Sequence, residues 1–269
     1  MIDVQAPHDR STTVHHQEAV MGTVVTIDLF CRDGLDVDLC AQPVLNAVRV
    51  LHEADLVFST WKSDSPISRL RRGEITIGDC PPVVAEVLDI CRTAMANVNG
   101  WFNPWALDGG VDPTGLVKGW AAERALDELR AAPVDGAMVN ASGDIASFGG
   151  LGDVTPFNVG IVQPNHPDLV ACVVELRGAL ATSGTYERGQ HLRNPFLGTN
   201  EVSVASASVT GPDLAMADAF ATALAVGGPP VMALIDQIPS YEAFTIGLDG
   251  AWSSTAKFPF IRGNSPSAS

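Results

Sequence analysis

The amino-acid sequence predicts an α+β fold, a single compact domain with a mixed, largely antiparallel sheet flanked by helices. Segments with the alternation of strands and segments with the apolar spacing of helices follow one another without the regular βαβ rhythm of a parallel sheet. The chain has 269 residues, of which 46% are hydrophobic and 17% are charged. This length and composition are typical of a globular protein with a sizeable core.

The net charge and the composition restrict the classes of function that the protein could have. A net charge of −15 disfavours nucleic-acid binding, which needs a basic surface. Five cysteines form no C-x-x-C pair, which is typical of scattered thiols in a reducing compartment. No stretch is long and apolar enough to cross a membrane, so we expect a cytoplasmic protein without membrane insertion. We expect a domain over residues 18–262 between disordered tails at 1–17 and 263–269.

The first half of the chain is mostly helical in pattern. Alternation of apolar and polar residues predicts a half-buried strand over 19–30. Apolar residues at helical spacing predict helices over 38–58 and 82–99, the second preceded by prolines and followed by glycine. A glycine-rich stretch over 109–115 then leads into a helix that ends at residue 129.

The second half is rich in short strands with tight turns between them. Short apolar or alternating runs predict strands over 137–141, 157–162, 171–176, 179–183, 203–210 and 241–248. Proline, alanine and glycine patterns predict helices over 211–228 and 230–238.

The alanine-rich helix over 211–228 holds the first candidate site. Asp218 and Thr222 are four residues apart, so both side chains emerge on one face of this helix. A carboxylate and a hydroxyl placed in this way suit a hard cation such as Mg²⁺. The alternative is a half-buried helix in which Asp218 is simply hydrogen-bonded and Thr222 bonds its own backbone.

Three loops could bind an aromatic or anionic ligand. Trp61 lies in a hydroxyl-rich loop that is either a stacking platform or a connection capped by Ser65 or Ser68. Trp101 and Phe102 either line a pocket for a flat heterocycle or seal the core. The glycine-rich stretch before Lys118 is either an anion site at a helix N-terminus or an Asp-Pro turn that caps the helix.

The order of these pieces resembles the ApbE family, the FAD:protein FMN transferases. Seven short motifs occur in the order that this family has, and together they span about residues 20–228. They are Met21-Gly22-Thr23, Phe58-Ser59-Thr60-Trp61, Gly100-Trp101-Phe102-Asn103-Pro104, Asp112-x-x-Gly115-x-x-Lys118-Gly119, Gly143-Asp144-Ile145, Thr182-Ser183-Gly184-x-Tyr186 with His191, and Ala217-Asp218-x-x-x-Thr222.

The resemblance implies an ApbE-like domain with FAD as substrate and Mg²⁺ as cofactor. FMN would be transferred to a Thr or Ser hydroxyl of a target protein, with release of AMP. Asp218, Thr222 and the backbone carbonyl of Gly115 would be the metal ligands. His191 would accept the proton of the attacking hydroxyl, although a structural hydrogen bond is the alternative for this residue. The residues implied to contact FAD are Met21, Trp61, Trp101, Phe102, Asn103, Asp112, Lys118 and Leu192.

The chain departs from the family pattern at three positions. Asn103 and Asn194 stand where the family usually has Asp, and Ser142 replaces a glycine. Asparagine removes a negative charge but keeps hydrogen-bonding capacity, so FAD binding is expected while the transfer rate is open. Two other functions therefore stay open, an Mg²⁺-dependent FAD pyrophosphatase that forms FMN and AMP, and a non-catalytic FAD-binding or flavin-storage protein.

Overall fold

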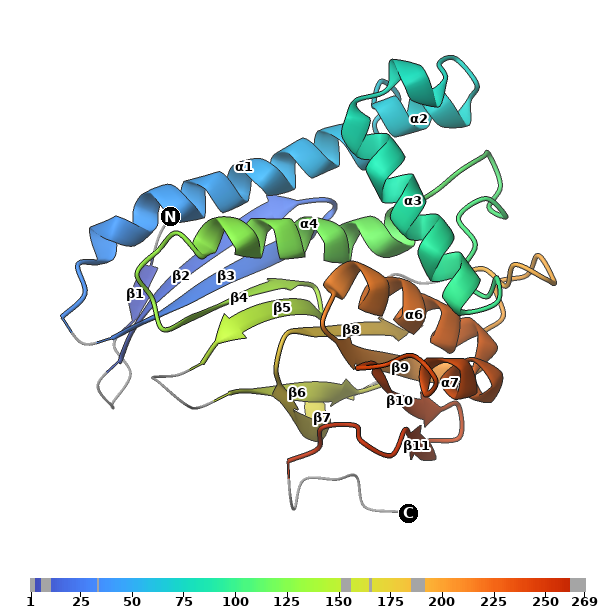
Figure 1. Cartoon of the computed structure of the whole chain (residues 1–269). Coiled ribbons are helices and arrows are strands. Elements are labelled where there is room, and N and C mark those ends of the chain that lie inside the picture. The colour runs from blue at the N-terminus through green and yellow to red at the C-terminus, as the bar shows by residue number, and fades with distance from the viewer. Residues whose placement is uncertain are drawn as a thin grey trace.

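The computed structural model describes residues 3–5, 11–32, 34–150, 156–164, 166–184 and 192–261. Within these residues the predicted α+β fold is confirmed (Figure 1). The strands are β1 (Asp3–Gln5), β2 (Ser11–Val20), β3 (Thr23–Arg32), β4 (Gly136–Ala141), β5 (Asp144–Gly149), β6 (Phe157–Gln163), β7 (His166–Leu176), β8 (Ala179–Gly184), β9 (Val204–Gly211), β10 (Glu242–Gly247) and β11 (Trp252–Ser254).

The described strands form one nine-stranded sheet and a separate hairpin of β6 and β7. The order in the sheet is β1-β2-β3-β4-β5-β8-β9-β10-β11. Every neighbouring pair in this order is antiparallel, so the sheet that the sequence predicted as mixed and largely antiparallel has no parallel pair among the described strands.

Helices cover one face of this sheet. They are α1 (Ala41–Phe58), α2 (Pro66–Arg71), α3 (Pro82–Asn97), α4 (Thr114–Leu129), α6 (Leu214–Gly227) and α7 (Pro229–Ile235), with short 3-10 turns η1 (Val37–Cys40) and η2 (Ile77–Asp79). In Figure 1, α1 and α4 lie across β2 to β5, while α6 lies over β8 and β9. Val25, Ile27 and Leu29 alternate toward the helices and are fully buried, because an antiparallel strand with one covered face places every second residue in the core.

The opposite face carries a second, smaller core. The hairpin of β6 and β7 packs there, with Ile145, Leu180, Phe244 and Phe258 contributing from the sheet and the C-terminal segment. Strand β9 is buried along its whole length because both of its faces are covered. The central strands β5, β8 and β9 are therefore mostly buried between the two cores.

The N-terminal segment corrects two expectations. Strand β2 begins at Ser11, inside the segment 1–17 that was expected to be a disordered tail, and it pairs with β3 over its full length. The strand expected over 19–30 is in fact split by a tight turn at Met21 and Gly22, which both adopt positive φ. The tail expected at 263–269 lies outside the described residues.

None of the described helices combines the length and the apolar character that a membrane span requires. Four cysteines are buried in the core, namely Cys31, Cys40, Cys91 and Cys172, while Cys80 is partly exposed, and all five are free thiols.

Candidate active site at the start of α4

Helix α6 positions the two residues predicted to bind a metal. Its N-cap is Asp213, whose carboxylate accepts the N–H of Met216, so the helix begins at Leu214, two residues after Pro212. Asp218 is 4% exposed and lies on the side of α6 that faces α4. Thr222, one turn further, is half-buried and faces β8.

Gly119 allows α4 to approach α6 closely enough to meet Asp218. A methyl group at Gly119 would lie 2.6 Å from the carbonyl oxygen of Leu214 and 3.0 Å from Cβ of Asp218, so no larger residue fits there. The N–H of Gly119 donates to Oδ2 of Asp218 at 3.1 Å. In a regular α-helix this N–H pairs with the carbonyl of Gly115. Asp218 therefore competes for the N–H of Gly119 with the carbonyl of Gly115, which was predicted to bind a metal.

The three predicted metal ligands converge. A methyl group at Gly115 would lie 3.5 Å from Oγ1 of Thr222, and Oγ1 of Thr222 lies 3.4 Å from Oγ of Ser183 on β8. The donor types at this point are a carboxylate, hydroxyls and a backbone carbonyl, all of them oxygens. No group of three or more His, Cys, Asp or Glu residues suited to a metal occurs in the described parts of the chain. The donor set fits Mg²⁺, which needs only one or two carboxylates when a substrate phosphate completes its shell.

A buried ion pair lies beside these oxygens. The ammonium group of Lys118 pairs with Oδ2 of Asp144, the first residue of β5, and the Lys118 side chain is only 15% exposed. Asp144 itself is fully buried, and its Oδ1 accepts the backbone N–H of Thr182 at 3.2 Å. The sequence noted Asp144 as part of a motif but gave it no role, because its burial and its partners depend on three separate segments of the chain.

Three backbone amides at the start of α4 already have hydrogen-bond partners. The N–H of Thr114 donates to Oδ1 of Asp112 at 3.0 Å, while the N–H groups of Leu116 and Val117 both donate to the carbonyl of Pro113 at 3.0 Å. The other carboxylate oxygen of Asp112 binds Arg71 at 2.5 Å. The Asp-Pro turn that the sequence offered as the alternative is therefore present and caps the helix, and Lys118 lies one turn further along α4.

The predicted aromatic segment is divided between core and surface. The ring of Phe102 is 4% exposed and would lie 3.3 Å from a methyl group at Gly115, so it seals the core directly behind the metal-ligand candidates. Trp101 is half-buried, packs against Gly227 and meets the exposed Phe196 edge to face, with ring centroids 4.8 Å apart. Asn103 accepts the N–H of Trp105 and so stabilises its own loop.

The remaining predicted contacts have no described link to the oxygen cluster. Trp61 is 96% exposed, which excludes a place in the core, and Ser65 caps α2 as the sequence suggested. Met21 lies in the tight turn between β2 and β3 and packs against the core, and Leu192 is buried. His191, the predicted base, lies outside the described residues.

The loop that begins at residue 192 is fastened to the loop before α4. Arg193 makes two contacts with the carboxylate of Asp108, at 3.0 and 3.2 Å. Asn194 is buried, and its Oδ1 accepts the N–H groups of Phe196 and Leu197. Because asparagine and aspartate accept these bonds equally well, this departure from the family pattern preserves the turn.

The half-buried carboxylate of Glu123, one turn beyond Gly119, makes the α4–α6 contact sensitive to pH. Oε2 of Glu123 accepts the N–H of Leu214 at 3.2 Å. Burial, then the negative charge of Asp213 and to a smaller extent that of Asp127, together raise the pKa of Glu123 to about 7, although backbone hydrogen bonds from Leu214 and Ala215 act in the opposite direction. The pKa of the neighbouring Tyr241 is also raised, first by burial and then by Asp213 and Glu123. The folded protein therefore holds the Glu123 proton more tightly than the unfolded chain does.

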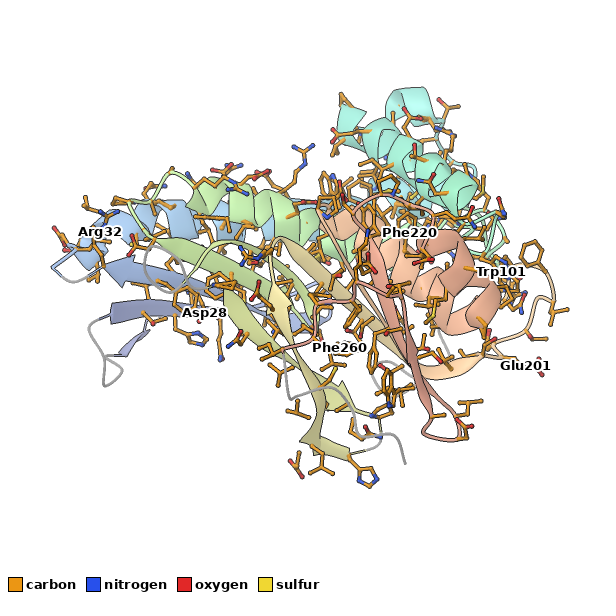
Figure 2. All side chains as sticks on the ribbon, turned by 60° about the horizontal axis from the view of Figure 1, so that its bottom comes forward. Asp28, Arg32, Trp101, Glu201, Phe220 and Phe260 are labelled. Carbon is orange, nitrogen blue, oxygen red and sulfur yellow. The ribbon has the colours of Figure 1, made fainter. Side chains whose placement is uncertain are left out.

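We expect Glu123→Gln to remove a pH-dependent loss of stability. Since the pKa of Glu123 is raised on folding, its contribution is fully present below the unfolded pKa near 4.5 and is lost as the pH rises to about 7. Each pKa unit is worth about 1.4 kcal/mol before partial exposure reduces it, so the variant should be at least ~1 kcal/mol more stable than the parent at pH 8. Urea unfolding at pH 4 and pH 8 measures this difference. The exposed Glu201→Gln is the control (Figure 2), and an equal change in parent and Glu123→Gln would refute the assignment.

Comparison with solved structures defines the class of fold. The flavin transferase ApbE of Vibrio cholerae superposes with a TM-score of 0.75 at 22% sequence identity, covering 93% of this chain and 100% of that one. The flavinyl transferase ApbE of Pseudomonas stutzeri gives 0.74 at 21% identity, with 93% and 97% covered. The ApbE protein of Thermotoga maritima gives 0.77 at 18% identity, with 91% and 97% covered. At these identities the comparison establishes the fold.

Sequence comparison establishes the family. A profile of the ApbE family matches residues 106–245, which is just over half of the chain and includes α4, β5, β8 and α6. The chain belongs to the ApbE family, as the motifs had suggested.

Two relatives carry the name FAD:protein FMN transferase. The protein of Rhodobacter capsulatus is 35% identical over 127 residues, which are 44% of this chain and 24% of that relative. The protein of Treponema pallidum (strain Nichols) is 32% identical over 158 residues, which are 51% of this chain and 43% of that relative. The chain thus matches less than half the length of either relative.

Proposed function

We propose that this protein transfers FMN from FAD to a Thr or Ser hydroxyl of a target protein, with Mg²⁺ as cofactor. The acceptor oxygen forms a bond to the phosphorus of the FMN half, and the bond from that phosphorus to the bridging oxygen of the pyrophosphate breaks. The proton of the hydroxyl passes to a base, and AMP leaves with the bridging oxygen. The proposal is supported by family membership and by the names of the two relatives.

One observation carries the proposal, namely the convergence of oxygen donors beside a buried cation. Asp218 and Thr222 from α6 meet the start of α4 at Gly115 and Gly119, and Lys118 extends from the same turn of α4. Oxygen ligands next to an ammonium group suit a pyrophosphate that binds a metal ion on one side and a cation on the other. In a chain with a net charge of −15, such local compensation is needed before an anionic substrate can bind.

The residues have separate tasks in this scheme. Asp218, Thr222 and the carbonyl of Gly115 would hold Mg²⁺, which when bound supplies neutralisation of pyrophosphate charge. Lys118 would bind a phosphate oxygen, and Phe102 excludes water behind the ligands. The other proposed FAD contacts are Met21, Trp61, Trp101, Asn103, Asp112 and Leu192. Asp112 already accepts hydrogen bonds from Arg71 and Thr114, so it would contact FAD in addition to these two partners. His191 would take the proton from the hydroxyl.

Incubation with FAD, Mg²⁺ and a peptide containing Ser and Thr tests the function. Chromatography of the flavins and mass spectrometry of the peptide distinguish three results. A peptide that carries FMN, with AMP released in equal amount, supports the transferase. Free FMN with AMP and an unmodified peptide indicates a pyrophosphatase, and intact FAD indicates a binding protein. The same mixture with EDTA in place of Mg²⁺ should leave FAD intact.

We expect Trp61→Ala to weaken FAD binding without loss of stability. The side chain is 96% exposed, so its removal creates no cavity. Stacking of an aromatic side chain on a base is worth ~1–3 kcal/mol, and a flavin or adenine ring on Trp61 should gain a similar amount. This corresponds to a dissociation constant raised about 5- to 150-fold. Flavin fluorescence titration measures the change, Trp61→Phe should retain most of the affinity, and equal affinity in Trp61→Ala and parent would exclude the contact.

A further inference from the structure

Asp144 is a buried carboxylate with no assigned task, and both of its oxygens are engaged. It follows the tight turn of Ser142 and Gly143 and begins β5. One oxygen accepts the backbone N–H of Thr182 on β8, and the other pairs with the ammonium group of Lys118 on α4. A fully buried carboxylate is costly unless it is paired and hydrogen-bonded, so its position is tightly determined by these partners.

Asp144 completes a ring of contacts around the proposed site. Two adjacent residues of α4 have different partners, because Lys118 pairs with Asp144 while Gly119 donates to Asp218. Two adjacent residues of β8 also have different partners, because the N–H of Thr182 donates to Asp144 while Ser183 contacts Thr222. The contact of Ser183 with Thr222 therefore depends on a strand that Asp144 holds in place.

Lysine is rare in this chain, so few lysine ammonium groups are present to bind a phosphate. The chain has 31 acidic residues and only three lysines, Lys62, Lys118 and Lys257. Lys62 pairs with Asp55 at the surface, and Lys257 is exposed. Lys118 has the least exposed side chain of the three, with 15% exposed. A flexible lysine side chain loses considerable entropy when it binds a ligand, and a fixed carboxylate partner removes part of that loss in advance.

The geometry points to Asp144 as a positioning residue that orients Lys118 toward the pyrophosphate of FAD and holds β8 against Thr222. This inference rests on the proposed function. Asp144 does not touch the substrate in this scheme, and it acts through Lys118. Its negative charge also balances the ammonium group, so Lys118 is held in one orientation when no phosphate is bound.

A double-mutant cycle with Lys118 tests this role. Asp144→Asn keeps the acceptor for the Thr182 N–H but removes the charge, and turnover of FAD with Mg²⁺ should fall about 10- to 100-fold at saturating FAD, as for other residues that support a ligand-binding group. FAD affinity should also fall, because Lys118 keeps its charge but loses the partner that fixes its side chain in advance. In a Lys118→Met background the same change should have no further effect. Equal losses in both backgrounds would show a merely structural role and overturn the inference.

A distant carboxylate provides the matched control. Asp28 pairs with His15 at 2.6 Å on β3 and lies at the opposite end of the molecule from Trp101 (Figure 2). Asp28→Asn should leave FAD affinity and turnover at the parent level. A parent protein without Mg²⁺-dependent turnover refutes the proposed function itself, whereas an active parent matched by an equally active Asp144→Asn refutes only the positioning role.

A measurement on the parent protein applies even if Asp144→Asn fails to fold. With three lysines in the chain, an NMR spectrum of lysine labelled at Nζ contains few signals, and Lys118→Arg identifies that of Lys118. We expect the Lys118 signal to shift when FAD and Mg²⁺ are added, while that of Lys257 stays in place. An unchanged Lys118 signal at saturating FAD would contradict the inference.

Discussion

Replacement of Asp218 by asparagine is expected to lower Mg²⁺-dependent turnover of FAD by at least about 100-fold. Residues that only support a metal ligand are already worth about 10–100-fold, and Asp218 is the one carboxylate among the proposed ligands. Asparagine can still accept the N–H of Gly119, so the α4–α6 contact and the stability of the protein should change little. Initial rates of FAD consumption across a Mg²⁺ titration measure the effect.

The Mg²⁺ dependence separates a metal ligand from a packing residue. Asp218→Asn should need more Mg²⁺ for half-maximal rate, whereas Asp28→Asn should match the parent throughout the titration. Parent-like turnover by Asp218→Asn, or full activity of the parent in EDTA, would remove Asp218 from the metal site.

His191→Ala is expected to lower the transfer rate by ~10²–10⁴, the usual contribution of general base catalysis. FAD affinity should be retained, because the proposed contacts with FAD come from other residues. The transfer rate of the parent should rise with pH through the pKa of the histidine, since only the neutral imidazole accepts a proton, and this rise should vanish in the variant.

Three measurements on His191→Ala distinguish the possible roles. The transfer rate at saturating FAD, the FAD dissociation constant and the melting temperature are compared with those of His52→Ala. His52 lies on α1 and pairs with Glu18 on β2. Weaker FAD binding with normal transfer at saturation would indicate a positioning role, and a lower melting temperature with normal transfer would indicate a structural one. Either result would contradict the assignment as base.

The long helices could be predicted because their patterns are local. α3 was expected over 82–99 and spans Pro82–Asn97, and the helix that was expected to end at 129 is α4, Thr114–Leu129. β2 was missed because its sequence is polar, and its side chains pair across elements, as in the bond between Glu18 and His52. β5 was missed because its first four residues are buried on both faces, which leaves no alternation to detect.

The candidate site could be predicted in part. The spacing of Asp218 and Thr222 placed them on one helix, and the resemblance to the ApbE family added Gly115 and Lys118. The links from Gly119 to Asp218 and from Lys118 to Asp144 join residues far apart in sequence, so no local pattern reveals them. Of the two alternatives at the start of α4, the cap forms, because Asp112 and Pro113 accept the N–H groups of Thr114, Leu116 and Val117. The sequence feature that indicates this cap is Asp112, which has a short side chain with an oxygen two residues before Thr114.

Intact-mass spectrometry of an acceptor protein with exposed Ser and Thr residues, incubated with FAD and Mg²⁺, tests the central claim most directly. The parent protein should add one FMN unit through a phosphoester bond, with one AMP released for each acceptor modified, and Asp218→Asn should add almost none in the same time. An acceptor that keeps its mass while FAD is consumed, or equal modification by parent and Asp218→Asn, would contradict the proposed transfer at this site.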